Sequence, residues 1–142
     1  MVLPRPMLHS ENCDFSFSGL KTAVLYALRD IKLDDAVREE FAREFEDAVV
    51  EILIKKTKKA IDAHGVQTLV LGGGVSANTH IRRSFERMIE EEYNDVSLYL
   101  PPPELTTDNA LMIAVAGYFR AKKRPKIALD SIQAKGNLSL TS

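Results

Sequence analysis

Three short stretches of the chain carry residue types that could do chemistry. The first is the run Gly72-Gly73-Gly74-Val75-Ser76-Ala77-Asn78, which follows an aliphatic segment and precedes a helical pattern. Glycines there let the backbone turn tightly and let a ligand approach closely, while the amides of a helix start attract an anion or a polar nucleotide edge. A tight turn without a ligand explains one or two glycines but poorly explains three followed by Ser and Asn. The run therefore predicts nucleotide-binding residues, namely Gly72, Gly73, Gly74, Ser76 and Asn78.

The same run satisfies G-x-G-x-x-A, the fingerprint of Rossmann dinucleotide-binding domains. That fingerprint requires an acidic residue at the end of the second strand, where it binds the ribose. Here the second strand ends with Tyr99-Leu100-Pro101 and has no acid. The nucleotide-binding turn of another fold therefore fits the sequence better than a Rossmann domain.

The second stretch, Thr106-Thr107-Asp108-Asn109, precedes an apolar helical segment. Composition favours a structural explanation, in which a threonine caps the helix and Asp108 complements the positive end of the helix dipole. The functional alternative is a carboxylate that binds a metal or organises a phosphate, because helix starts after sheet strands face the ligand side of α/β folds. Both explanations stay open for Asp108.

The third stretch, Ser18-Gly19-Leu20-Lys21, matches the S-x-x-K pattern of penicillin-recognising enzymes. The companion S-D-N and K-T-G motifs occur nowhere in the chain, so this short pattern does not indicate an acylase. The three histidines, His9, His64 and His80, are too dispersed to form an H-x-x-x-H metal-ligand pair.

Apolar periodicity predicts a helix-rich α/β fold. The strands near 67–71 and 96–100 and the helix between them form a βαβ unit, whose strands should be parallel. In order, the expected elements are a half-buried strand at 15–18, a helix with Ser18 as N-cap, a helix from about 34 to 63, a buried strand at 67–71, a helix from Ser76 or Ala77, a strand at 96–100 and an apolar helix capped by Thr106 or Thr107. The body of that last helix, 110–119, is apolar nearly all round, so we expect it to be buried with help from a neighbouring domain or subunit.

Four lysines, Lys55, Lys56, Lys58 and Lys59, stand near the end of the longest predicted helix. They match the helix dipole, and Glu51 can pair with Lys55 at i, i+4. We interpret the lysines as a solvated helix end rather than a nucleic-acid patch, because no aromatic residue is interleaved for base stacking.

Length and composition indicate one ordinary globular domain. The chain has 142 residues, 45% of them hydrophobic, and a formal net charge of -1. Near-neutral charge gives no overall field for a nucleic acid or an anionic membrane, so any such contact must be local or shared with a partner. The single cysteine, Cys13, excludes an internal disulfide and suits a reducing cytoplasm. The start of the chain lacks the apolar core of a signal peptide, and the longest apolar run is about half the roughly 20 residues that span a bilayer, so we expect a soluble, cytoplasmic protein.

The chain beyond Pro125 has a different character. A short strand is conceivable at 127–129, and then Gly136, Asn137 and Ser139 indicate poor order. We therefore expect a domain at 1–125 and a partly disordered tail at 126–142.

Three motifs in this order resemble the C-terminal half of the TsaD family. They are Asp14-Phe15-Ser16-Phe17-Ser18-Gly19-Leu20-Lys21-Thr22, Leu71-Gly72-Gly73-Gly74-Val75-Ser76-Ala77-Asn78 and Thr107-Asp108-Asn109-Ala110-Leu111-Met112-Ile113-Ala114. Members are tRNA adenosine threonylcarbamoyltransferases, long known as O-sialoglycoprotein endopeptidases or glycoproteases. The resemblance implies the fold shared by actin, sugar kinases and heat-shock ATPases. It also implies transfer of threonylcarbamoyl from threonylcarbamoyl-AMP to N6 of adenosine 37, in tRNAs that read codons beginning with A.

The resemblance also implies roles for single residues. The glycine-rich nucleotide motif falls on 72–78, with the substrate-binding asparagine at Asn78, and the metal-binding aspartate falls on Asp108. Thr106 replaces the usual cysteine before that aspartate, and Ile81 replaces a leucine in the motif that ends at Arg82. In such enzymes the aspartate joins two histidines of an H-x-x-x-H helix to hold iron or zinc, which can polarise the transferred carbonyl.

The chain departs from the family pattern because it contains no H-x-x-x-H and none of the motifs of the family's N-terminal half. It resembles a C-terminal piece, so we expect half a nucleotide site for ATP, AMP or threonylcarbamoyl-AMP and one of three metal ligands. A single carboxylate should not hold iron or zinc tightly. The implied partners are the missing N-terminal half, TsaB-like and TsaE-like proteins, and tRNA only in the assembled complex.

Three functions follow from these observations. The first is a fragment of a threonylcarbamoyltransferase that is inactive alone. The second is a non-catalytic module that binds a TsaB-like partner or self-associates through helices. The third is a glycoprotease, which the sequence supports least because it offers no complete metalloprotease site.

Overall fold

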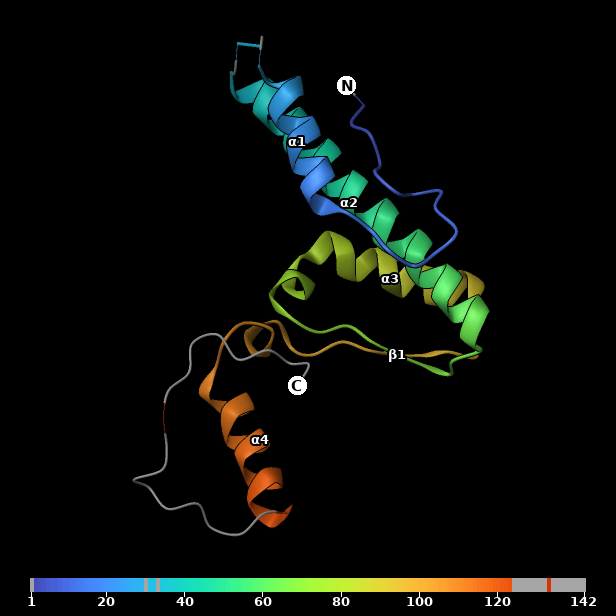
Figure 1. Ribbon diagram of the computed structural model, residues 1–142, viewed down its shortest axis with the longest axis vertical. Coiled ribbons are helices and arrows are strands. Elements are labelled where there is room, and N and C mark those ends of the chain that lie inside the picture. The colour runs from blue at the N-terminus through green and yellow to red at the C-terminus, as the bar shows by residue number, and fades with distance from the viewer. Residues whose placement is uncertain (1, 30, 33, 124–132, 134–142) are drawn as a thin grey trace. The chain divides into compact units, whose positions relative to one another are not determined.

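A computed structural model describes residues 2–29, 31–32, 34–123 and 133 (Figure 1). The chain divides into two compact units, Met1–Thr107 and Asp108–Ser142. The first unit is rich in helices and contains a short parallel sheet, which confirms the predicted α/β class. The conceivable strand at 127–129 and the expected start of the tail at 126 lie outside the described residues. None of the helices in the described part is long and apolar enough to cross a membrane.

The first helix, α1, spans Phe17–Ala27 and begins where a strand was expected. Ser16, in extended backbone, caps it by accepting a 3.3 Å hydrogen bond from the amide of Gly19. The predicted strand at 15–18 and the predicted cap at Ser18 are therefore wrong. The alternation of Phe15 and Phe17 has another cause, because their rings lie against each other with centroids 5.1 Å apart.

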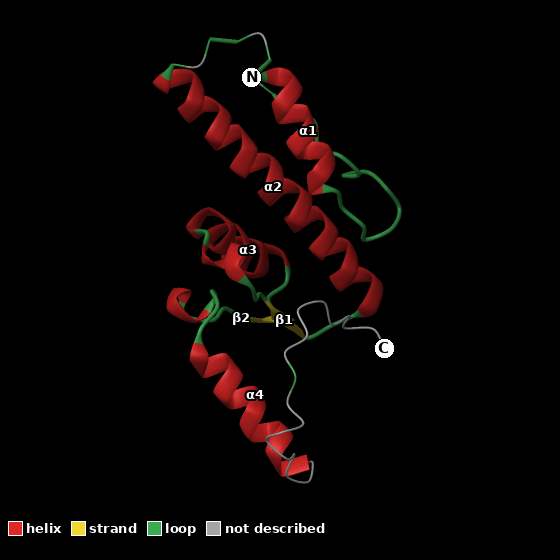
Figure 2. Cartoon of the chain, turned by 60° about the vertical axis from the view of Figure 1, so that its left-hand side comes forward, coloured by secondary structure: helices red, strands yellow, loops and turns green. Residues whose placement is uncertain are grey.

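The second helix, α2, spans Asp35–His64, close to the predicted bounds. Asp34 caps its start by accepting from the amide of Val37, and Gly65 ends it in the left-handed conformation at φ 58°. The helices α1 and α2 lie side by side (Figures 1 and 2). Their contact surrounds a buried cluster of four apolar residues: Leu3, Leu20, Phe41 and Ala48.

The predicted βαβ unit is confirmed. Strand β1 (Thr68–Val70) pairs in parallel with β2 (Ser97–Tyr99), with Leu69 opposite Leu98. Helix α3 (Thr79–Glu92) connects them and packs with α2 against one face of the sheet. The core there consists of five buried residues: Ile61, Ile81, Phe85, Met88 and Val96.

The two strands are half-buried on one face and exposed on the other, so the prediction of a buried strand at 67–71 is wrong. Leu69 and Leu98 pack on the core, whereas Val70 and Tyr99 are 67% and 61% exposed. This is the alternation of a sheet with one covered face.

A 3-10 turn, η1 (Gly74–Ala77), precedes α3 and delays its start by two to three residues relative to the prediction. A second 3-10 turn, η2 (Pro103–Leu105), follows the three prolines after β2. Helix α4 (Ala110–Lys123) belongs to the second unit. Asn109 caps it by accepting a 3.0 Å bond from the amide of Met112, whereas the Thr106 hydroxyl donates to the carbonyl of Pro103.

The apolar surface of α4 is exposed within its own unit. Leu111, Ile113 and Phe119 are each more than half exposed, and the helix has no buried residue. The described residues of its unit therefore do not provide the burial expected of this helix.

Charged side chains fix the N-terminal segment along α2. Arg5 donates to Glu44, and its Nε donates to Glu51 at 2.7 Å. The amide of Leu3 donates to the same Glu44 carboxylate at 2.8 Å. Glu51 thus pairs with Arg5, where the sequence predicted Lys55 as its partner.

The predicted solvated lysine run is wrong at one position. Lys56 is only 4% exposed, and its ammonium donates to the carbonyl and hydroxyl of Ser10 and to the carbonyl of Asn12. The lysine run therefore contacts the N-terminal segment instead of facing solvent throughout.

We expect the Arg5 and Glu44 contact to make the fold sensitive to acid. The hydrogen bond from Arg5, followed by that from the Leu3 amide, lowers the pKa of Glu44 below its ordinary value of 4.5. A carboxyl whose pKa is lower in the folded state stabilises the fold above the unfolded-state pKa and loses this effect as the pH falls through the folded-state pKa. The temperature of the unfolding midpoint should therefore decrease as the pH is lowered below 4.5.

The Glu44→Gln variant should lose about 1–2 kcal/mol of the free energy of unfolding at pH 7. Its thermal midpoint should depend less on pH below 4.5, because its side chain cannot titrate. Circular dichroism melts from pH 7 to 3 measure both effects. The control is Glu39→Gln, whose partner Arg43 is on the exposed surface and whose loss should cost at most about 0.5 kcal/mol. Superimposable acid profiles of the Glu44 variant and the unchanged chain would contradict the prediction.

Candidate functional site

The parallel pairing of β1 and β2 brings two turns to one edge of the sheet. The glycine-rich run follows β1, and the proline run follows β2, so both leave from the carboxyl ends of the strands. The turns η1 and η2 are in contact. Ligands of open α/β sheets bind at this edge, which is where the sequence placed its nucleotide-binding candidates.

The three glycines of the run differ in whether the backbone conformation requires glycine at that position. Gly73 has φ 86° and ψ 166°, a conformation that favours glycine. Gly72 and Gly74 do not have a positive φ, and a Cβ at either would meet no atom of the described residues within 4 Å. Backbone strain thus explains the glycine at 73, whereas neither strain nor packing against the described residues explains the glycines at 72 and 74.

Ser76 holds the turn together from inside. Its hydroxyl donates to the carbonyl of Gly73 at 2.7 Å, its amide donates to the same carbonyl at 3.0 Å, and the residue is 4% exposed. The hydroxyl therefore fixes the shape of the turn.

Asn78 is the N-cap of α3 and also contacts α2. Its Oδ1 accepts from the amides of His80 and Ile81, and its Nδ2 donates to the Glu46 carboxylate at 2.9 Å. The structure thus adds Glu46, a residue that the sequence analysis missed because nothing in its spacing marks it.

Arg82 joins the two turns. Its Nε donates to the carbonyl of Ser76 at 2.6 Å, and its Nη2 donates to the carbonyl of Pro101. The helical period places Arg82 away from the apolar face of α3, so its role could not be read from the period. The signal that could have found it is its place at the end of the motif that continues from Asn78, one turn into α3, where a long donor side chain can reach back to carbonyls of the preceding turn.

Two pockets of about 330 Å³ share Val75 and Ile81. One lies beside Gly72, Ser76 and the apolar residues of β1, α2 and α3. The other is lined by Glu46, Asn78 and apolar residues of α2. Mostly apolar walls with a few polar groups are typical of small-molecule sites of this size.

Asp108 is an exposed residue at the start of the second unit. Among the residues that the structure describes, no three His, Cys, Asp or Glu side chains are gathered as metal ligands. Two of the histidines have other contacts, His9 with Lys55 and His80 with Asp47. The donor set of the described chain does not fit a tightly held iron or zinc ion.

Comparison with known proteins connects this geometry to a family. The family model described as TsaD: tRNA N6-adenosine threonylcarbamoyltransferase matches residues 1–115. A tRNA N6-adenosine threonylcarbamoyltransferase of Thermosipho africanus is 46% identical over 138 residues, which cover 96% of this chain. A protein of the same name from Ralstonia pickettii is 45% identical over 133 residues, 90% of this chain. The chain spans only 41% and 38% of the lengths of these two relatives.

Proposed function

The chain belongs to the TsaD family, and on that premise we propose that it forms part of a tRNA N6-adenosine threonylcarbamoyltransferase. In this reaction N6 of adenosine 37 bonds to the carbamoyl carbon of threonylcarbamoyl-AMP. The bond from that carbon to the phosphate oxygen breaks, AMP leaves, and N6 loses a proton. The chain would supply part of the nucleotide site within an actin-like fold, and the rest of the enzyme and TsaB-like and TsaE-like partners would complete it.

The observation that carries this proposal is the open space at Gly72 and Gly74. A glycine that neither its backbone conformation nor its packing requires is expected where a ligand approaches the backbone closely. Both residues stand at the carboxyl edge of the sheet, and Gly72 lines one of the 330 Å³ pockets. We propose that the nucleotide lies against this backbone and that the amide group of Asn78 binds it by hydrogen bonds.

In this proposal Asp108 is one ligand of an iron or zinc ion whose other ligands, two histidines, are absent from this sequence. The described residues alone do not fit the metal, so we derive no step of the reaction through it. We infer that the chain by itself holds neither ion tightly.

Nucleotide binding tests the proposed site. Gly72→Ala places a methyl group where a nucleotide would lie, and Asn78→Ser keeps an N-cap while it removes the amide donor. Each change should weaken AMP binding about tenfold, which is about 1.4 kcal/mol, as measured by calorimetric titration of the chain. Lys32→Ala is the control and should leave AMP binding unchanged, since Lys32 is exposed and is not among the described residues that line the pockets. Equal effects of all three changes would favour a tight turn without a ligand.

Transfer activity tests the inference that the chain is incomplete. Incubated with tRNA and threonylcarbamoyl-AMP, the chain should form no threonylcarbamoyladenosine above background, as measured by nucleoside analysis. The full-length Thermosipho relative, supplied with TsaB-like and TsaE-like partners, serves as the positive control. Robust transfer by this chain without any partner would exclude the inference that the chain is incomplete.

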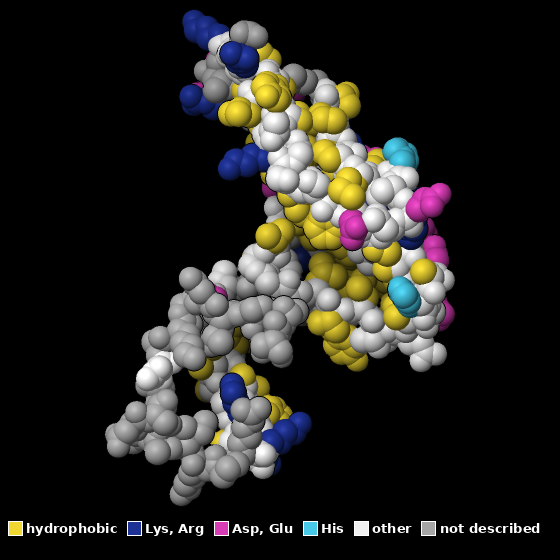
Figure 3. All heavy atoms as spheres, viewed as in Figure 1, with side chains coloured by type: hydrophobic (Ala, Val, Ile, Leu, Met, Phe, Trp, Pro, Cys, Tyr) yellow, Lys and Arg dark blue, Asp and Glu magenta, His cyan; other side chains and the backbone are white. Residues whose placement is uncertain are grey.

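A second candidate function, a non-catalytic interaction module, is favoured by exposed apolar side chains on α1. Leu25 and Tyr26 are 70% and 66% exposed, and hydrophobic patches are visible on the α1–α2 pair (Figure 3). If this surface mediates self-association, light scattering after size exclusion should give a mass that rises with concentration. The double change Leu25→Ser and Tyr26→Ser should then restore a monomer, whereas Lys21→Ser on the same helix should not. A monomer at all concentrations would count against self-association.

A further inference from the structure

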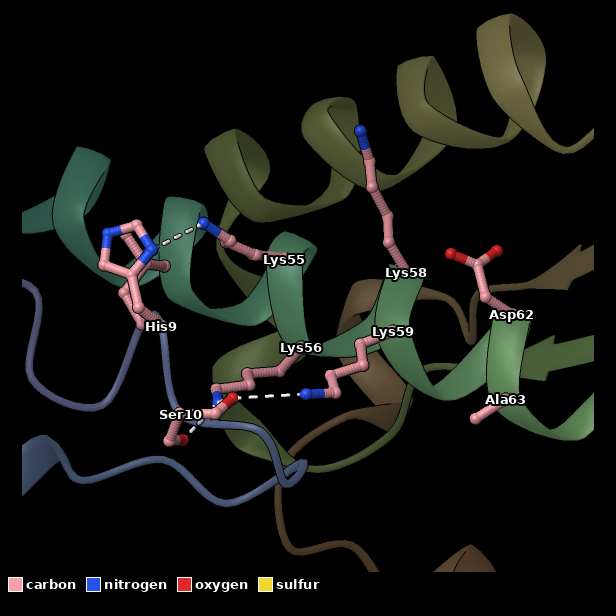
Figure 4. A pocket seen from close by; sticks show the side chains of 9 residues that line it. His9, Ser10, Lys55, Lys56, Lys58, Lys59, Asp62 and Ala63 are labelled. Atoms are coloured by element: carbon pink, nitrogen blue, oxygen red, sulfur yellow. Dashed lines mark hydrogen bonds between the residues drawn. The ribbon is translucent and has the colours of Figure 1, made fainter.

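A separate pocket of about 600 Å³ lies where the N-terminal segment passes the last turns of α2. Four lysines of α2 line it together with Leu8, His9 and Ser10 of the N-terminal segment (Figure 4). The lysines are those at positions 55, 56, 58 and 59, which follow i, i+1, i+3 and i+4 spacing on the helix. This set of lysines and segment residues is called the lysine pocket below.

The ammonium groups of the lysine pocket are held mainly by uncharged acceptors. Lys56 donates to the carbonyl and hydroxyl of Ser10 and to the carbonyl of Asn12, and Lys59 donates to the carbonyl of Ser10. Lys55 lies 3.1 Å from a ring nitrogen of His9. Such contacts fix the positions of the ammonium groups without cancelling their positive charge.

Nearby acids compensate only part of this charge. Lys58 forms an ion pair with Glu92, and Asp62 lines the pocket while it accepts from the hydroxyl of Tyr93. Four lysines against these two acids leave a local excess of two positive charges. The negative end of the α2 dipole is equivalent to about half a charge, so it reduces this excess without removing it.

The chemistry of the lining selects a class of ligand. Ammonium groups bind phosphate oxygens as point charges, and the positively charged side chains among the described residues of the lining are all lysines. The described residues of the lining also include no Phe, Tyr or Trp on which a base could stack. We propose that the lysine pocket is a binding site for phosphate oxyanions, either the backbone of an RNA or a small phosphate compound.

The accessible lysines would make the contact, and the buried lysine would support them. Lys55 is exposed and Lys59 is half-buried, so an anion can reach both, whereas Lys56 is 4% exposed and holds the segment in place. The net charge of the whole chain is -1, so binding must be local and strongly dependent on salt. The site is independent of the glycine-rich turn and of the function proposed for it.

The test measures binding of a fluorescein-labelled oligouridine of about 12 nucleotides to the full 142-residue chain by fluorescence anisotropy over a salt series. The double change Lys55→Gln and Lys59→Gln should weaken binding about tenfold at low salt. It should also lower the slope of log K against log salt by about 1.4, since each lost contact to a single strand accounts for about 0.7. Lys55→Arg with Lys59→Arg should retain binding because the charge is kept.

The matched control is Lys21→Gln with Lys32→Gln, which removes the same charge from exposed positions outside the pocket. It should change neither affinity nor slope appreciably. Circular dichroism melts of every variant establish that each is folded, and Lys56 is left unchanged because it holds the segment.

Calorimetric titration with inorganic pyrophosphate distinguishes the two sources of phosphate. Binding of oligouridine that depends on Lys55 and Lys59 supports an RNA backbone, and binding of pyrophosphate alone with the same dependence supports a small phosphate compound. The proposal is overturned if neither probe binds, or if the pocket variant and the control lose affinity equally.

Discussion

The parallel pairing of two three-residue strands is the constraint on which the candidate site depends. Parallel strands need a crossover, and the crossover here contains α3, which also covers one face of the sheet. The pairing places the turn after each strand at the same edge. Arg82 then joins the turns by donating to one carbonyl of each, so that the position of the glycine-rich run depends on the end of β2 as well as on β1.

Cationic side chains perform a similar task at the other end of the first unit. The N-terminal segment has little regular structure of its own, and it is fixed along α2 by Arg5 on Glu44 and Glu51 and by Lys56 on carbonyls of the segment. Leu3 can be 1% exposed in the cluster between α1 and α2 because these contacts hold the segment in position. Packing of α1 and α2 thus depends partly on charged contacts formed at a distance in the sequence.

The sequence predicted the long elements well and the local details less well. Helix α2, its glycine C-cap and the parallel βαβ unit were predictable, because apolar period, glycine and β-branched residues act over many positions. The strand at 15–18 was wrong because the same alternation also fits two aromatic rings in tilted contact at the start of a helix. The glycines indicated the turn of the candidate site, but the contacts of Arg82 and Glu46 were not predicted, because long side chains bond to groups that periodicity cannot place.

The positions of lysine and arginine in a sequence do not predict what surrounds their charged groups. A helical wheel assigns a side chain to a face by the direction of its Cβ, yet a Lys or Arg head lies several bonds further out and can turn back to a carbonyl. Lys56 and Arg82 both do so, and a backbone carbonyl accepts the hydrogen bond without neutralising the charge. The cost of such burial is offset by hydrogen bonds, while the field of the cation persists in its surroundings. A cation held in this way fixes the backbone and at the same time makes the adjacent surface attractive to an anion.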